Sequence, residues 1–130
     1  MSLKKNKAKA QTIKKRFAAK LLFQFRVIIG KSSGKRRLCE KRIVQFLAVN
    51  AKSALKETNF RGNRGQYSYK NTDENLVRFE FLGIEELLCL DPGCDSDEVW
   101  YEIVELVKPK ERIAKFIPAV KKLNAIRNKD

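Results

Sequence analysis

The sequence predicts an α+β domain built on a mainly antiparallel sheet of about five strands. Two stretches, residues 17–29 and 76–83, alternate apolar and polar side chains, as strands with one buried face do. Short stripes of apolar residues at helical spacing lie between and after them. The expected order is strand, strand, helix, three strands, helix, with the short helix packed on the sheet and further helices at the C-terminus.

Residues 97–107 carry the strongest strand pattern and the only Trp. Val99, Tyr101, Ile103 and Val107 fall on one face, interrupted by Glu105; Trp100, Glu102, Val104 and Leu106 fall on the other. Because both faces are largely apolar, we expect this strand to be covered on both sides. A central position in the sheet follows.

The first two predicted strands, residues 17–29 and about 36–49, are expected to form an antiparallel hairpin around a turn at 30–35. The turn resembles a phosphate-binding loop, but that motif needs Gly at 29 and Ser or Thr at 36. The chain has Ile29 and Arg36, so a nucleotide-binding loop is excluded.

Asn50 is the expected cap of a short helix that ends near residue 58 or 59. A glycine-containing loop at 60–65 then presents Arg61 and Arg64, and a short strand at 66–70 presents Tyr67 and Tyr69. Arginine beside stacked tyrosine is typical of single-stranded nucleic-acid binding. The same tyrosines also fit an ordinary cross-strand pair.

Past the strand at 76–83, the spacing of Ile84, Leu87 and Leu88 predicts a helical turn. A helix with Pro109 in its first turn follows residue 107; its buried stripe is predicted to be Ile113, Phe116 and Ile117. A second short stripe (Val120, Leu123 and Ile126) follows Pro118.

Charge is segregated along the chain, whose net charge is +14. Residues 1–16 are a Lys-rich leader without an acid, expected to be flexible, and 17–130 are expected to form one domain. Residues 17–72 have a balance of +11, residues 73–107 of −10 and residues 108–130 of +6. Opposite charges on neighbouring strands would simply offset one another; alternatively, a basic face attracts an anionic partner such as RNA or DNA.

The working hypothesis is a non-catalytic binding domain that engages nucleic acid or a ribonucleoprotein through a basic face. That face would comprise the leader with Arg26, Lys35, Arg36, Arg37, Arg61 and Arg64, and with Tyr67 and Tyr69 for stacking. The alternative is a protein-binding module, such as a toxin-neutralising immunity protein. It would use the acidic block 73–107, with Glu85, Glu86, Asp95 and Asp97 as contacts, although such proteins are expected to be acidic overall.

An enzyme is the less favoured class, because the chain has no His and so lacks the commonest general base and metal ligand. The best enzymatic case is a metal-dependent nuclease with Glu80 and Glu102 on neighbouring strands. The competing interpretation pairs Glu80, Glu102 and Glu105 with basic residues of the first hairpin. We expect no metal, no cofactor and no catalytic residue.

Three Cys (39, 89 and 94) have no disulfide-framework spacing, and no secretory signal precedes them, so a cytoplasmic setting is expected. The apolar run 17–29 is too short and too charged to span a membrane.

Five stretches together resemble a known family: residues 20–25, 37–43, 77–83, 97–103 and 116–118. In order and spacing they are similar to the bacterial domain-of-unknown-function family 4288, over about residues 17–128. The resemblance implies a small bacterial α+β protein. It carries over no catalytic residue.

Overall fold

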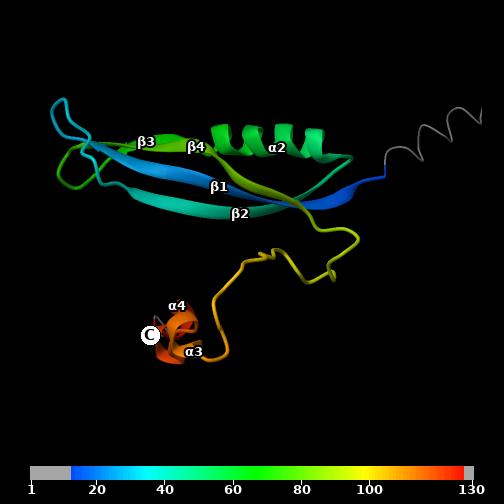
Figure 1. The fold of residues 1–130 in the computed structure, drawn as a ribbon. Helices are drawn as coiled ribbons and strands as arrows, with labels where there is room; N and C mark the ends of the chain where they lie inside the picture. The colour runs from blue at the N-terminus through cyan, green and yellow to red at the C-terminus, as the bar shows by residue number, and fades with distance from the viewer. Residues whose placement is uncertain (1–12, 128–130) are drawn as a thin grey trace, which may run out of the picture.

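The computed structural model describes residues 13–127, so most of the leader lies outside the described residues. Four strands form one antiparallel sheet in the order β2-β1-β4-β3 (Figure 1). They are β1 (Lys15–Ile28), β2 (Leu38–Ala48), β3 (Tyr67–Lys70) and β4 (Leu76–Cys89). The α+β class and the antiparallel sheet are confirmed, whereas the sheet has four strands in place of the expected five.

The first hairpin is confirmed: β1 pairs antiparallel with β2, with Lys15 opposite Ala48 and Phe25 opposite Leu38. Helix α2 (Ala51–Arg64) lies on one face of the sheet and covers part of it (Figure 1). The core lies between them. Phe17, Ala19, Leu21 and Phe23 of β1 are buried there together with Phe46, Ala48, Ala54 and Phe79. The opposite face of the sheet is called the open face below.

Helix α2 is longer than expected, and the predicted glycine loop at 60–65 is wrong for a physical reason. Asn50 caps the helix as predicted: its Oδ1 accepts a hydrogen bond from the Ser53 amide at 2.8 Å. Gly62, however, sits inside the helix against the sheet. A Cβ there would lie 2.4 Å from Cε2 of Phe81. The glycine therefore permits close packing of the helix on β4, although glycine usually disfavours a helix interior.

The predicted helical turn at 84–88 is also wrong, because β4 continues unbroken to Cys89. Its pairing with β1 shifts twice, so that Leu82 and Glu85 are extra residues without a partner on β1. Such bulges bend a strand and increase its twist, which suits the curled sheet. They also displace the side-chain alternation by one residue each time. The spacing of Ile84 and Leu87 imitates a helix for that reason.

Residues 97–107 do not form the central strand that the alternation predicts. This segment, called the C-terminal arm below, is extended and belongs to no strand. Its first half contacts the open face: Lys20 Nζ lies 2.8 Å from Oε1 of Glu102 and 5.2 Å from the ring centroid of Trp100. The prediction of a central strand is therefore wrong, and the place beside β1 is taken by β4.

The C-terminal helices are short and lie away from the sheet (Figure 1). They are α3 (Ile113–Phe116), the 3₁₀ turn η1 (Val120–Lys122) and α4 (Asn124–Arg127). The predicted buried stripe is wrong, since the side chains of Ile113 and Ile117 are exposed and none of these helices contains a buried residue. Among residues 13–127 no helix has both the length and the apolar character that crossing a membrane requires.

Candidate nucleic-acid interface at the hairpin end of the sheet

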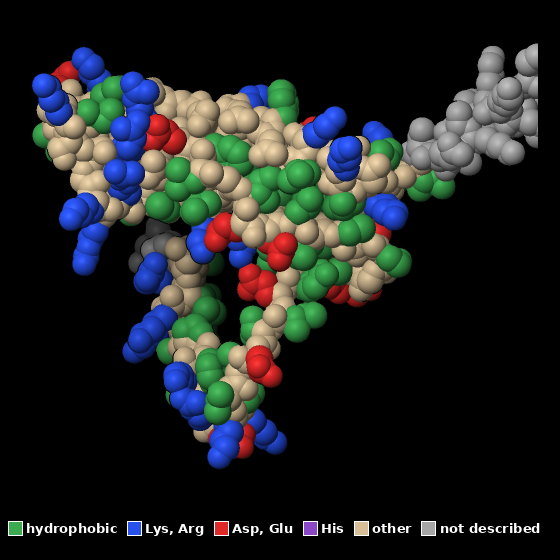
Figure 2. Space-filling model, turned by 45° about the horizontal axis from the view of Figure 1, so that its top comes forward, with side chains coloured by type: hydrophobic (Ala, Val, Ile, Leu, Met, Phe, Trp, Pro, Cys, Tyr) green, Lys and Arg blue, Asp and Glu red, His purple; other side chains and the backbone are tan. Residues whose placement is uncertain are grey.

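Seven cationic side chains gather at the end of the sheet that carries the β1–β2 loop, which we call the hairpin end. The neighbouring β3–β4 turn lies at the same end, because Ile28, Leu76 and Lys70 are partners in the sheet (Figure 1). Figure 2 shows Lys and Arg side chains concentrated there. The seven are Lys31, Lys35, Arg36 and Arg37 of the loop, Arg26 of β1, Lys70 of β3 and Arg78 of β4. Acidic residues at this end are Glu80 on β4 with Asp73 and Glu74 in the turn.

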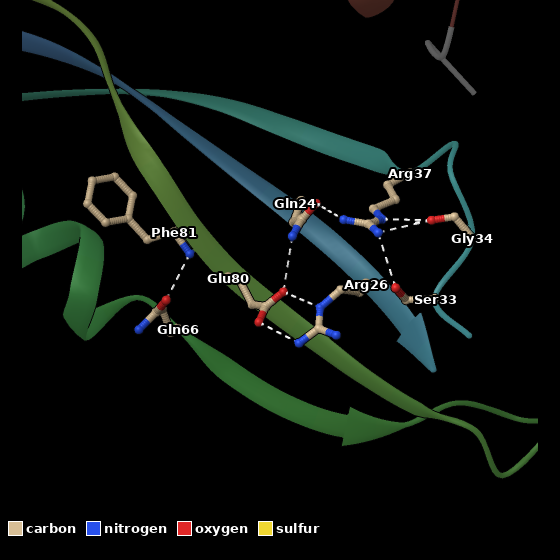
Figure 3. A network of polar contacts seen from close by, with 8 residues as sticks. All are labelled: Gln24, Arg26, Ser33, Gly34, Arg37, Gln66, Glu80 and Phe81. Atoms are coloured by element: carbon tan, nitrogen blue, oxygen red, sulfur yellow. Dashed lines mark hydrogen bonds and ion pairs between the residues drawn. The ribbon is translucent and has the colours of Figure 1, made fainter. Parts of the chain in front are cut away.

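Two of the seven cations belong to a polar network across the open face (Figure 3). Arg26 donates to both carboxylate oxygens of Glu80, at 2.7 and 2.9 Å, and Gln24 donates to Glu80 Oε1 at 3.1 Å. Arg37 donates to Gln24 Oε1 at 3.1 Å and to the Gly34 carbonyl. The network therefore joins β1 to β4 and holds the loop against the sheet.

The same contacts shift the pKa values of Glu80 and Arg26. The hydrogen bonds from Arg26 lower the pKa of Glu80, helped by Gln24 and by the charges of Arg26 and Arg78. Burial of the carboxylate opposes them. In return, the hydrogen bond to Glu80 raises the pKa of Arg26. Glu80 is thus ionised at neutral pH and neutralises Arg26, which confirms the interpretation that Glu80 pairs across strands.

The other five cations (Lys31, Lys35, Arg36, Lys70 and Arg78) are exposed and have no ion-pair partner within residues 13–127. Arg78 lies directly opposite Arg26 in the register of β1 and β4. Like charges in direct opposition destabilise a sheet. Glu80 relieves one of the two arginines, so Arg78 keeps an uncompensated charge at the surface.

Tyr67 and Tyr69 lie at this end on the outer strand β3. Their positions opposite Phe79 and Val77 place them on the α2 side of the sheet, the face opposite to that of Arg26 and Arg78. Their rings stack at 6.0 Å between centroids, and Tyr67 also contacts buried Phe79 at 5.0 Å. Both remain about half exposed, at 51% and 44%. A hollow of about 260 Å³ beside them is lined by Tyr67 and Arg78 together. The predicted aromatic pair and Arg78 therefore project from opposite faces of the sheet and both border this hollow at its β3 edge.

Arg61 and Arg64 lie elsewhere, in the last turn of α2, on the other face of the sheet from Arg26. Arg61 pairs with Glu57 at 2.7 Å and stacks on Phe46; Arg64 stacks on Phe60. With Arg42, whose guanidinium lies 4.7 Å from the ring of Phe23, they border a hollow of about 180 Å³. Cations at a helix C-terminus also complement the helix dipole, so a structural role accounts for this pair.

The acidic residues of the alternative hypothesis form two separate groups. Glu85 pairs with Lys41 at 3.3 Å and, with Glu86, borders a hollow of about 500 Å³ between the open face and the arm. Trp100 and Glu102 line its other side. Asp95 lies in the exposed loop before the arm, where its carbonyl accepts a hydrogen bond from Arg16, and Asp97 is the first residue of the arm.

Glu80 and Glu102 do not sit on neighbouring strands, as the nuclease hypothesis requires, because Glu102 belongs to the arm and pairs with Lys20. That ion pair confirms the expected pairing of Glu102 with the first hairpin. The hydrogen bond from Lys20 lowers the pKa of Glu102, and proximity to Trp100 and the charge of Lys20 act in the same direction. Within residues 13–127, no group of three His, Cys, Asp or Glu side chains is placed to hold a metal ion.

Sequence reasoning missed Lys70 and Arg78 as members of the hairpin end. The alternation of Val77, Arg78, Phe79 and Glu80 was visible, but which strand lies beside β1 was not. Only the order β2-β1-β4-β3 brings Arg78 next to Arg26.

No family model, no curated protein and no solved structure matches this chain.

Proposed function

We propose that the protein is a non-catalytic binding domain that holds single-stranded nucleic acid at the hairpin end of the sheet. The observation that carries this proposal is a group of five exposed cations, without ion-pair partners among residues 13–127, at the same end of the sheet as two stacked, half-exposed tyrosines. Lysine and arginine neutralise phosphates, and tyrosine rings stack on bases irrespective of sequence. Single strands are favoured over duplex because an aromatic surface reads unpaired bases.

The assignment divides the basic residues by role. Lys35 and Arg36 contact phosphates, with Lys31, Lys70 and Arg78 added to the set first expected. Arg26 and Arg37 hold the loop and the sheet in place through Glu80 and Gln24. Arg61 and Arg64 are engaged with Glu57, Phe46 and Phe60 in the last turn of α2, and we assign them long-range attraction only.

The test compares charge reversal at two places on the full chain. Lys31→Glu with Lys35→Glu changes the hairpin end; Lys52→Glu with Lys56→Glu makes the same change of charge on exposed positions of α2. Affinity for a labelled single-stranded oligonucleotide is measured by fluorescence anisotropy across a salt series. We expect the first pair to weaken binding by roughly tenfold or more and to lower the salt slope by ~2, because two phosphate contacts are lost.

Equal loss in both double variants would mean that net charge, and not the hairpin end, attracts the strand. Tyr67→Ala with Tyr69→Ala separates stacking from charge: we expect a loss of about 1–3 kcal/mol per stacked base without a change in the salt slope. Unchanged affinity in the tyrosine variant would contradict the stacking role.

The protein-binding alternative has one observation in its favour, the acidic hollow of about 500 Å³ between Glu85, Glu86 and the arm. Its size and charge suit a Lys or Arg side chain of a basic partner protein. If the hairpin variants bind nucleic acid as well as the unchanged chain does, Glu85→Lys with Glu86→Lys becomes the variant to test against basic proteins. The resemblance to family 4288 stays a prediction and assigns no activity that favours either function.

A further inference from the structure

The C-terminal arm is extended like a strand, yet its backbone has no partner. Within residues 13–127, no backbone amide or carbonyl between Val99 and Leu106 takes part in a hydrogen bond. Its second half is also apolar and uncovered: the exposed fractions are 90% for Ile103, 66% for Val104, 43% for Leu106 and 68% for Val107. These side chains alternate to both faces of the segment, so a strand partner and cover on two sides would be needed to bury them.

Strand β2 has an unpaired backbone edge with which such a segment can form a strand pair. It is the outer strand of the sheet, eleven residues long, and one side of its backbone faces away from β1. Apolar side chains along it are exposed, with Ile43 at 46% and Leu47 at 59% on the open face. A long, exposed outer strand is a template for pairing with another chain unless something blocks it. No Pro, bulge or covering segment blocks β2 within the described residues.

Charge selects β2 over the opposite side of the sheet. The arm contains four acids (Asp97, Glu98, Glu102 and Glu105) and no Lys or Arg. Strand β2 and the loop before it supply Arg36, Arg37, Lys41 and Arg42 against Glu40 alone. On the opposite side, β3 has only four residues, and the part of β4 beyond it carries Glu80, Glu85 and Glu86. Acidic residues of the arm would be repelled there.

The arm does not reach β2 of its own chain in this structure. Trp100 and Glu102 anchor it on Lys20 of β1, and beyond Glu102 it runs away from the sheet toward α3 (Figure 1). We propose that residues 103–107 of one copy add as a strand to β2 of a second copy, and that the second copy returns the same contact. The anchor at Trp100 stays in its own subunit. Reciprocal exchange of this kind is a common route to a two-fold dimer.

The inference does not depend on the proposed function, since the hairpin end and the arm are separate surfaces. Its first test is the mass of the full chain in solution, by light scattering and sedimentation equilibrium. We expect twice the 15.1 kDa of one chain. Ile103→Asp with Val107→Asp, the arm variant, should raise the dimer dissociation constant by roughly a hundredfold, because charges replace apolar side chains at both contacts. Both positions are exposed in one copy, so its circular dichroism should not change.

A control is Ile29→Asp, which makes one such substitution at a residue 63% exposed at the hairpin end and should leave the dimer intact. Val104→Pro breaks strand pairing without adding charge and should also release monomers. A wild-type chain that stays monomeric at high concentration would overturn the proposal. So would an arm variant that dimerises normally.

Complementation distinguishes the arm contact from any other dimer. Ile43→Asp changes β2 and leaves the arm intact, so alone it should be monomeric like the arm variant. In a mixture, the arm of the Ile43→Asp chain meets an unchanged β2 on the arm variant, which restores one of the two contacts. We expect heterodimers in the mixture and in neither variant alone. A mixture that remains monomeric would refute pairing between the arm and β2.

Discussion

Strand β1 and the C-terminal arm show the same kind of sequence pattern and have different structures. Both alternate along their length, and both contain aromatic and branched apolar residues. Strand β1 lies between β2 and β4 and is paired along its length on both sides, with two bulges on the β4 side. The arm makes two side-chain contacts with Lys20 and has no backbone pairing within residues 13–127. Alternation therefore specifies an extended backbone, and a strand forms only where a neighbour satisfies its hydrogen bonds.

The sheet with α2 and the C-terminal region also differ in how deeply their apolar side chains are buried. Leu21 of β1 is 1% exposed, and Phe23 beside it is stacked on Phe79 at 4.7 Å. In the C-terminal region, apolar residues of similar size such as Ile117 and Val120 are more than 60% exposed. The sheet and α2 hold the core, so the stability of one copy depends on them and hardly on the residues after 97. Each prediction below tests that division.

The largest difference is expected between matched truncations in the two regions. Leu21→Ala should lower the free energy of unfolding by about 3 kcal/mol, because it leaves a cavity against Phe23 and Arg42. Ile117→Ala should change it by less than ~0.5 kcal/mol, since the side chain is mostly in solvent. Urea unfolding followed by circular dichroism gives both values. Comparable losses would show that the C-terminal helices share the core of the domain.

A smaller difference is expected for an added methyl group at two glycines. Gly62→Ala places a Cβ 2.4 Å from Cε2 of Phe81, whereas Gly93→Ala meets nothing within 4 Å. We expect the first to destabilise the protein by about 1–2 kcal/mol, because overpacking outweighs the better helix propensity of Ala. The second should be neutral. In a Phe81→Leu background the penalty at Gly62 should shrink; a penalty that persists would locate its cause outside this contact.

The sequence predicted the first hairpin, the Asn50 cap and the short strand with its two tyrosines because each depends on local signals. Asn50 bonds a residue three positions away, and the hairpin joins neighbours in the chain. The wrong predictions concern elements whose structure depends on contacts between residues far apart in the chain. The two bulges of β4 arise from its pairing with β1. Gly62 is found inside a helix because a residue without a side chain is needed where the helix packs against Phe81 of β4.

The candidate site was predicted in part for the same reason. Lys35, Arg36, Tyr67 and Tyr69 lie at the hairpin end as single exposed residues, but the neutralisation of Arg26 by Glu80 depends on two strands that are 54 residues apart in the chain. The separation of Arg61 and Arg64 from this end follows from the length of α2. The sequence therefore shows which charged and aromatic side chains are present, but the order of strands in the sheet determines which of them contact one another.

The smallest effect is expected at two ion pairs, one in the sheet and one that anchors the arm. Hydrogen bonds lower the pKa of both Glu80 and Glu102 below the ordinary value of 4.5. A carboxylate with a lowered pKa stabilises the fold above that value, and the contribution is lost as the pH falls through the folded-state pKa. Glu80→Gln should therefore lower the melting temperature at neutral pH, and its difference from wild type should shrink as the pH falls below 4.5 through the lowered pKa of Glu80. Glu102→Gln should have less effect at every pH, because its side chain is 57% exposed and the pair with Lys20 is screened by salt. Melting curves of the two variants and the wild type at neutral pH and along an acid series, with and without added salt, give the comparison. A larger acid-sensitive loss at Glu102 would mean that the arm, and not the strand network, contributes more to the stability of the sheet.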